Sequence, residues 1–257
     1  MRRLALAVLG VVIFAGGYGA LRHHTGTTPL QPAAVASKPA GHQCDPRAIA
    51  PAGRAGDTLV ALVRSHVVAY RQVGGEVLRR FGSKNVNRAP TVFAIQAMHR
   101  NRSCTPAWYR VQIPVRPNGT TAWISAKSVR VLAINKKIVI HVRAARLELL
   151  QGGRVVFRAP IAPGAADTPT PIGHFYVTQR LVPKNPTGPW GPAALGTSAF
   201  SPVLKNWVQN GPVGIHGTDE PWVIGHPASH GCIRLLNSAM TRLFRLTPAG
   251  TPVLIAP

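Results

Sequence analysis

The sequence predicts a mainly β protein in which a small N-terminal β-barrel precedes a larger β domain that carries one short helix. Short runs rich in β-branched and aromatic residues recur roughly every ten residues over positions 57–132. Turn sequences that contain Gly, Asn or Pro separate these runs. Helix signal is scarce, and its best candidate is one segment near the C-terminus. These observations favour β architecture over a helical or α/β fold.

An apolar run follows the first three residues of the chain. Met1-Arg2-Arg3 precedes an uncharged segment from Leu4 to Leu21. Its length approaches the roughly 20 residues that span a bilayer and exceeds the roughly 7 to 15 of a secretory signal core. Residues 1–21 are therefore predicted to be a membrane anchor or a cleaved signal peptide. The arginines before the run predict that the rest of the chain lies outside the cytoplasm.

Residues 22–56 are rich in Pro and Ala and show little apolar periodicity. This composition is typical of an extended linker. The predicted linker would hold the folded part of the chain at a distance from a membrane.

The chain is strongly basic, with 30 Lys and Arg, 7 Asp and Glu, and a formal net charge of +23. A hydrophobic fraction of 46% over 257 residues is enough to build folded cores. The charge predicts an anionic partner. Nucleic acid is not expected, because no zinc-finger, helix-turn-helix or aromatic RNA-binding motif accompanies the charge. Anionic envelope polymers or lipid headgroups agree better with the predicted export.

Six β-type runs over residues 57–132 predict a small all-β barrel. The runs are Leu59–Val63, His66–Tyr70, Val77–Phe81, Val92–Gln96, Trp108–Ile113 and Thr121–Ser125. The stretch from Trp108 to Gly119, which closes on Ala122-Trp123-Ile124, resembles bacterial SH3-like domains. The resemblance implies an SH3-like domain over residues 57–132.

Residues 135–257 are predicted to form the larger β domain. The predicted elements are strands at Lys137–Val142, Arg146–Leu150 and Arg154–Ala159, a helix at Asn237–Leu246 and a final strand at Thr251–Ile255. The helix is expected to start from an Asn or Ser cap and to end before Pro248. The Pro-rich stretch from Gln179 to Asn210 is predicted to be one long functional loop.

The motif with the clearest chemistry is Ser229–Arg234 (SHGCIR), which follows His216 in the sequence IHGT. A cysteine is nucleophilic as its thiolate, and a nearby imidazole lowers the thiol pKa and carries the proton of the leaving group. Cys232 is therefore the candidate nucleophile, and His216 is the candidate general acid/base. The flexible backbone of Gly231 would allow the amides of Gly231 and Cys232 to bind one oxyanion.

Two further motifs flank this pair in the chain. Thr168–Phe175 (TPTPIGHF) lies upstream, and Ala249–Val253 (AGTPV) lies downstream. With them, the chain resembles the catalytic domain of the YkuD-type L,D-transpeptidases, which cross-link peptidoglycan. The resemblance implies a β-sandwich with one short helix over residues 135–257. It also implies that Cys232 forms a thioester with peptidoglycan stem peptides, and that no cofactor takes part.

The same resemblance implies roles for the neighbouring residues. Gly217 would orient the base histidine through its backbone carbonyl. From the residues themselves, Ser229 and His230 are expected to brace the cysteine loop by hydrogen bonds. Arg234 has two interpretations of equal weight. Its guanidinium either binds a substrate carboxylate or forms a structural ion pair.

Other arrangements of the same residues are considered as well. Asp219 is an alternative partner for the histidine, in a Cys-His-Asp triad. A zinc site is not expected, because the ligand spacing of structural and catalytic zinc sites is absent. Cys44 and Cys104 are candidates for a disulfide, which export would permit, and Cys232 is the expected free thiol.

These observations predict an extracytoplasmic L,D-transpeptidase, membrane-anchored or secreted into the cell wall, that forms or remodels peptidoglycan cross-links. One alternative is an L,D-carboxypeptidase of the same fold, in which water resolves the thioester. The other is a non-catalytic cell-wall-binding protein, in which the SH3-like domain and the positive charge carry the function.

Overall fold

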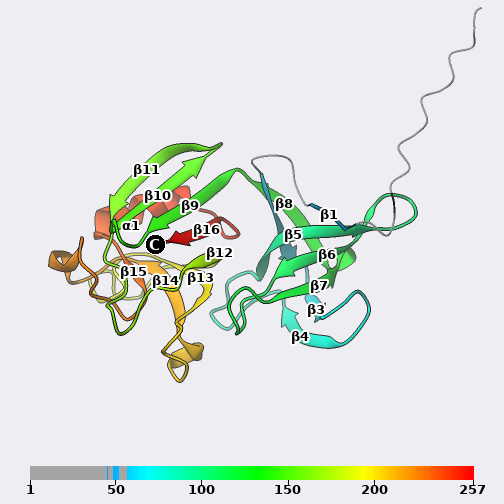
Figure 1. Ribbon diagram of the computed structural model, residues 1–257, viewed down its shortest axis with the longest axis horizontal. Helices are drawn as coiled ribbons and strands as arrows, with labels where there is room; N and C mark the ends of the chain where they lie inside the picture. The colour runs from blue at the N-terminus through cyan, green and yellow to red at the C-terminus, as the bar shows by residue number, and fades with distance from the viewer. Residues whose placement is uncertain (1–44, 46–48, 52–56) are drawn as a thin grey trace, which may run out of the picture. The chain divides into compact units, whose positions relative to one another are not determined.

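The computed structural model describes residues 45, 49–51 and 57–257 (Figure 1). The predicted anchor or signal peptide at residues 1–21 and most of the predicted linker at 22–56 lie outside these residues. Cys44 also lies outside them, so its disulfide with Cys104 stays a prediction. Within the described ranges, no helix combines the length and apolar character that crossing a bilayer requires.

The first sheet occupies the described residues up to Ile134. Its strands are β1 (Ile49–Pro51), β2 (Thr58–Val63), β3 (His66–Tyr70), β4 (Val77–Gly82), β5 (Val92–Arg100), β6 (Pro106–Gln112), β7 (Thr121–Ser125) and β8 (Val129–Ile134). One turn of 3-10 helix, η1 (Ala126–Ser128), precedes β8. The strand order is β4-β3-β7-β6-β5-β2-β8, and β1 pairs with β5.

Successive side chains of β2 point to opposite faces of the first sheet, and both faces are covered by apolar residues. Ala61 and Val63 point into the core of the first sheet, together with Phe93 of β5. Val60 points the other way, into a smaller apolar cluster that contains Tyr176 of the second sheet. The two sheets therefore share apolar surface, which fixes the first sheet beside the second.

Each of the six predicted runs lies on one of the strands β2 to β7. Strand β8 was not predicted. The expected SH3-like domain ended at position 132, which lies inside this strand. The SH3-like character of residues 57–132 stays a prediction.

The second sheet carries the rest of the chain. Its strands are β9 (Lys136–His141), β10 (Arg146–Gln151), β11 (Arg154–Pro160), β12 (Gly173–Leu181), β13 (Ala194–Phe200), β14 (Pro212–His216), β15 (Ile233–Arg234) and β16 (Pro252–Ala256). The short 3-10 turns η2 (Val208–Asn210) and η3 (Pro221–Val223) flank β14. The strand order is β11-β10-β9-β16-β12-β13-β14-β15.

Strand β12 joins the two layers of the second sheet. Its first half, Gly173 to Tyr176, pairs with β16, and its second half, from Val177 onward, pairs with β13. A register shift after Val177 marks the change of partner, and irregularities of this kind bend a strand. The result is a β-sandwich with one helix, as predicted, around a core of Ile, Leu and Val side chains.

The helix α1 (Asn237–Leu246) has the predicted limits. Met240 and Leu243 lie on its buried face and pack into the sandwich core. The predicted Asn or Ser cap is wrong: the capping position is Leu236, with no side-chain cap hydrogen bond. The Asn237 side chain is directed to Thr218 instead.

The predicted single loop from Gln179 to Asn210 is also wrong, because strand β13 lies inside it. The sequence of β13, ALGTSAF, is rich in small residues and carries little intrinsic β signal. Pairing with β12 on one side and β14 on the other makes it a strand. The irregular backbone is confined to residues 182–193 and 201–211, and both segments border the site described next.

Candidate active site

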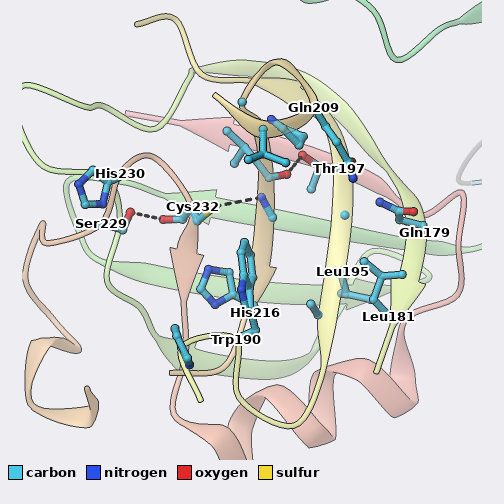
Figure 2. A pocket seen from close by; sticks show the side chains of 18 of the residues that line it. Gln179, Leu181, Trp190, Leu195, Thr197, Gln209, His216, Ser229, His230 and Cys232 are labelled. Carbon is cyan, nitrogen blue, oxygen red and sulfur yellow. Dashed lines mark hydrogen bonds between the residues drawn. The ribbon is translucent and has the colours of Figure 1, made fainter. Parts of the chain in front are cut away.

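Two neighbouring parallel strands place the candidate nucleophile and base on one face of the sandwich. Ile215 of β14 pairs with Ile233 of β15, and His216 pairs with Arg234. Both isoleucines are fully buried in the core. Because successive side chains of a strand point to opposite faces, Cys232, His216 and Arg234 share the other face. Figure 2 shows Cys232 and His216 together at the cavity on that face.

Cys232 is a free and partly buried thiol. The backbone N–H of Gly214 donates a hydrogen bond to its Sγ, with an N···S distance of 3.4 Å (Figure 2). Burial raises the pKa of the Cys232 thiol, and the Gly214 hydrogen bond and the Arg234 charge act in the opposite direction. The resting side chain is therefore a thiol that needs a base to become nucleophilic.

His216 is buried, and its ring has a defined orientation. Its Nδ1 lies 2.6 Å from the carbonyl oxygen of Gly217, which is the contact that the resemblance implies. A carbonyl only accepts hydrogen bonds, so Nδ1 carries the proton and Nε2 is left as the basic nitrogen. The ring of Trp190 covers the imidazole, with a centroid distance of 4.6 Å.

Burial sets the charge state of this histidine. It lowers the pKa of His216 to about 4, and the carbonyls of Gly217 and Pro189 only partly offset it. The imidazole is neutral at physiological pH. A neutral imidazole with a free Nε2 is the form that can accept a proton.

The buried imidazole predicts that stability decreases at acid pH. The pKa of His216 is about 4 in the folded chain and 6.5 for an unperturbed histidine, so the unfolded chain binds more protons between these values. The contribution of the neutral imidazole to the free energy of unfolding is fully present above pH 6.5 and is lost as the pH falls through 4. The loss amounts to at most about 3 kcal/mol. Urea unfolding near neutral pH and near pH 4 would measure it, with His216→Gln as the non-titrating control. An equal acid-induced loss in both proteins would contradict the prediction.

Ser229 braces the loop that carries Cys232. Its Oγ accepts the N–H of Gly231 at 3.1 Å and donates to the carbonyl oxygen of Cys232 at 2.5 Å. From the other side, Thr170 Oγ1 donates to the carbonyl oxygen of Gly231 at 3.0 Å. Gly231 has a φ of 105°, which is readily available to glycine.

The same contacts correct the predicted oxyanion site. The N–H of Gly231 donates to the Ser229 hydroxyl inside the loop. The N–H of Cys232 makes no hydrogen bond with any residue that the structure describes. Cys232 therefore supplies the available amide, and Gly231 shapes the turn that presents it.

Gly164 lies against this loop, and its substitution tests the packing. A Cβ at this position would lie 2.3 Å from Thr168 O and 2.9 Å from the Cα of Gly231. Backbone atoms cannot move aside as a flexible side chain can, so Gly164→Ala is expected to destabilise the fold by about 1–3 kcal/mol or more. Chemical denaturation would measure this change. The exposed Gly75→Ala, whose added Cβ meets nothing closer than 3.4 Å, should change stability by less than about 0.5 kcal/mol. Similar values for the two variants would contradict the packing argument.

His230 is placed differently from the prediction. It is exposed and makes no hydrogen bond within the described part of the chain, so it does not brace the loop. Its ring stacks against Trp207, with a centroid distance of 5.9 Å and an interplanar angle of 23°. The structure thus assigns His230 to the cavity wall.

Arg234 forms an ion pair with Glu220, through Nη1 and Oε2. This is the second of its two predicted interpretations, although the arginine also lines the cavity. The alternative triad is wrong: Nδ1 of His216 is held by Gly217, and no hydrogen bond joins Asp219 to that ring among the described residues. Within the same residues, no group of three or more His, Cys, Asp or Glu side chains is arranged to hold a metal ion.

The cavity in front of Cys232 has a volume of about 650 Å³. Trp190 and Trp207 form part of its walls, and Arg234, His216 and His230 are its basic side chains, beside the Cys232 thiol. None of its lining residues is a carboxylate. An extended ligand that carries carboxylate groups therefore meets apolar walls without acidic repulsion.

A turn of the first sheet supports one wall of this cavity. The side chain of Asn118 exchanges two hydrogen bonds with the backbone of Phe200, each 2.9 Å long. Nη2 of Arg116 donates to the carbonyl oxygens of Ser201 and Asn210, each at 2.8 Å. Both ends of segment 201–211 are thereby held by the first sheet.

Several residues of the site were not predicted from the sequence. Gly214 and Trp207 carry no motif that marks them individually, and the sequence marks Asn237 only as a helix cap. Asn87, in the loop between β4 and β5, also lines the cavity and contacts Gln209 and Gln179 through side-chain amides. Only the strand pairing and the loop contacts bring these residues to the cysteine.

The fold is a β-sandwich in which a thiol, Cys232, and an imidazole, His216, line one cavity. A family model of the L,D-transpeptidase catalytic domain, YkuD, matches residues 135–255. This match to residues 135–255 agrees with the resemblance found in the sequence.

Several known proteins are similar to this part of the chain. YkuD of Bacillus subtilis (strain 168) is 37% identical over 118 residues, which are 46% of this chain and 64% of that protein. YkuD of Bacillus licheniformis (strain ATCC 14580) is 36% identical over 121 residues, 47% of this chain and 66% of that protein. The chain thus spans somewhat less than two thirds of either relative. A crystal structure of a mutant Enterococcus faecium L,D-transpeptidase is 27% identical, covers 47% of this chain and 49% of its own, and has a TM-score of 0.36.

Proposed function

We propose that this protein is a peptidoglycan L,D-transpeptidase that works through a thioester on Cys232. The observation that carries the proposal is the pairing of a free thiol with a neutral imidazole on one face of the sandwich. The Gly217 carbonyl fixes the imidazole so that Nε2 is available as base. The match of residues 135–255 to the L,D-transpeptidase catalytic domain supports the choice of substrate.

The first half of the reaction forms the thioester. Nε2 of His216 takes the proton of the Cys232 thiol, and Sγ attacks the carbonyl that links the third and fourth residues of a stem peptide. The backbone N–H of Cys232 donates to the oxygen of the tetrahedral intermediate. The intermediate then expels the amine of the terminal D-amino acid, which takes the proton from His216.

The second half transfers the acyl group. An amine of a neighbouring stem peptide gives a proton to Nε2 of His216 and attacks the thioester carbonyl. The C–S bond breaks, a new amide forms, and the proton returns to the thiolate of Cys232. Because the thioester keeps the energy of the original amide in an activated form, the exchange requires no ATP.

Export and cell-wall attachment are part of the proposal. The apolar run at residues 4–21 behind two arginines supports an extracytoplasmic protein that is anchored or secreted. The net charge of +23 supports contact with anionic envelope polymers or lipid headgroups. An SH3-like domain at residues 57–132 would add a wall-binding module.

Incubation of the full chain with a stem tetrapeptide tests the proposed function. The expected products are the free terminal D-amino acid and, with an acceptor amine present, a cross-linked dimer. A trimmed monomer without dimer would identify a carboxypeptidase instead. If the wild-type protein releases the D-amino acid no faster than Cys232→Ala, the proposal of an enzyme fails and the wall-binding alternative is favoured.

A further inference from the structure

The first residue of helix α1 makes an unusual contact for its position. Side chains of Asn at helix N-termini commonly accept N–H groups of their own helix. Here Oδ1 of Asn237 accepts the backbone N–H of Thr218, at 2.9 Å. The side chain therefore links α1 to the segment that directly follows His216.

The peptide group that Asn237 binds is the one that holds the base. The N–H of Thr218 and the C=O of Gly217 belong to one planar trans peptide, so they point in opposite directions. The C=O accepts the Nδ1 proton of His216 at 2.6 Å, and the N–H donates to Asn237 at 2.9 Å. One peptide group thus stands between the imidazole and the side-chain amide, and hydrogen bonds in such a chain polarise one another.

Two glycines leave a narrow space for the amide oxygen. A Cβ on Gly217 or on Gly191 would lie 2.3 Å from Oδ1 of Asn237. The N–H of Gly217 also donates to Ala193 O, at 3.3 Å. Thr218 itself is 3% exposed, so water does not readily replace the amide oxygen there. The absence of side chains at Gly191 and Gly217 therefore leaves space for the Oδ1 acceptor of Asn237.

We propose that Asn237 is a positioning residue for the base. Its Oδ1 fixes the plane of the Gly217–Thr218 peptide, so that the Gly217 carbonyl keeps the proton of His216 on Nδ1 and Nε2 faces the thiol. Asn237 thereby supplies, through a peptide group, the orientation that a catalytic triad obtains from its third side chain. The effect of Asn237 on the rate of acylation rests on the proposed function, whereas its effect on the tautomer of His216 does not.

Loss of this acceptor has a defined consequence. Without Oδ1 the N–H of Thr218 is left buried and unpaired, and the peptide gains freedom to rotate toward another partner. The Gly217 carbonyl then no longer holds Nδ1–H, and the other tautomer becomes populated. By analogy with the partners that orient metal-bound histidines, we expect Asn237→Ala to slow acylation of Cys232 about 10- to 100-fold.

The experiment compares four variants of the full chain. Asn237→Ala and Asn237→Leu remove the acceptor, and the near-isosteric leucine serves if the alanine variant does not fold. Asn237→Asp keeps an acceptor oxygen, and Ser238→Ala is the control, because Ser238 is the exposed next residue of the same helix. Nitrogen-15 NMR of the imidazole reports the tautomer of His216 without substrate, and the rate of D-amino acid release from a stem tetrapeptide reports acylation.

The expected result is the Nδ1–H tautomer in the wild-type, Asp and Ser238→Ala proteins, and a mixture of tautomers in the variants without an acceptor. The added charge of Asn237→Asp should also raise the pKa of His216 above its wild-type value. A folded Asn237→Ala or Asn237→Leu protein with an unchanged tautomer overturns the inference. If the wild-type chain releases no D-amino acid while the tautomers shift as described, the proposed function fails and the positioning role of Asn237 stands.

Discussion

Replacing Cys232 with serine is expected to reduce D-amino acid release by at least about 10⁴-fold, because loss of a nucleophile in a catalytic unit typically has effects of this size or larger. A serine hydroxyl is much less acidic than a thiol, and His216, with a pKa of about 4, is too weak a base to activate it. The fold should persist, since Sγ accepts one hydrogen bond, from Gly214, which Oγ can also accept. The rate of release with a stem tetrapeptide measures the effect.

Unfolding experiments on the same variant separate chemistry from folding. The free energy of unfolding of Cys232→Ser should stay within about 1 kcal/mol of wild type, as expected for a partly buried isosteric change. Release of the D-amino acid at a rate within tenfold of wild type would mean that another group is the nucleophile.

Replacing His216 with glutamine is expected to lower the acylation rate by about 10²- to 10⁴-fold at neutral pH, the range typical of a lost general base. Glutamine can keep a hydrogen bond to the Gly217 carbonyl but cannot accept the thiol proton at neutral pH. Because burial raises the pKa of Cys232, very little thiolate forms without the base. The pH dependence of kcat/KM measures both effects.

The variant and the wild-type protein should differ most in the shape of that pH profile. For the wild-type protein we expect activity to be lost as the pH falls through about 4, where His216 becomes protonated. For His216→Gln we expect this acid limb to disappear. The rate should instead rise at alkaline pH, where the Cys232 thiol loses its proton to water without help from a base. An acid limb that is unchanged in the variant would assign the titration to another group.

The sequence predicted most of the strands that carry strong local signals. Strands β2 to β7 and β9 to β11 contain β-branched and aromatic runs between clear turns, and helix α1 has the predicted limits. Strand β13 was missed because its small residues are held as a strand by neighbours on both sides. Strand β15 has two residues, which is too short for any periodic pattern.

The reacting side chains of the site were easier to predict than the residues that hold them in place. Cys232 and His216 stand in short motifs, and the Gly217 carbonyl contact followed from the resemblance to YkuD-type domains. The local pattern marked Asn237 as a helix cap, whereas tertiary packing directs its oxygen to Thr218. The stacking of His230 on Trp207 depends on the fold of a distant loop, which no local pattern encodes.

The contacts by which the first sheet holds segment 201–211 were not predictable from either half of the sequence alone. Arg116 and Asn118 belong to a turn that reads as an ordinary hairpin connection. In the structure their side chains bind the backbone at both ends of segment 201–211. Contacts between residues so far apart in the chain arise from the packing of one sheet beside the other.

In the proposed function, neutral His216 activates Cys232 to form a thioester with a stem peptide. Intact-mass spectrometry of the full chain, quenched during turnover of a stem tetrapeptide, tests it most directly. We expect an adduct on Cys232 whose mass equals that of the substrate without its terminal D-amino acid. It should be absent in Cys232→Ala and slow to form in His216→Gln. Release of the D-amino acid by a protein that never carries this adduct, or an adduct on another residue, would contradict it.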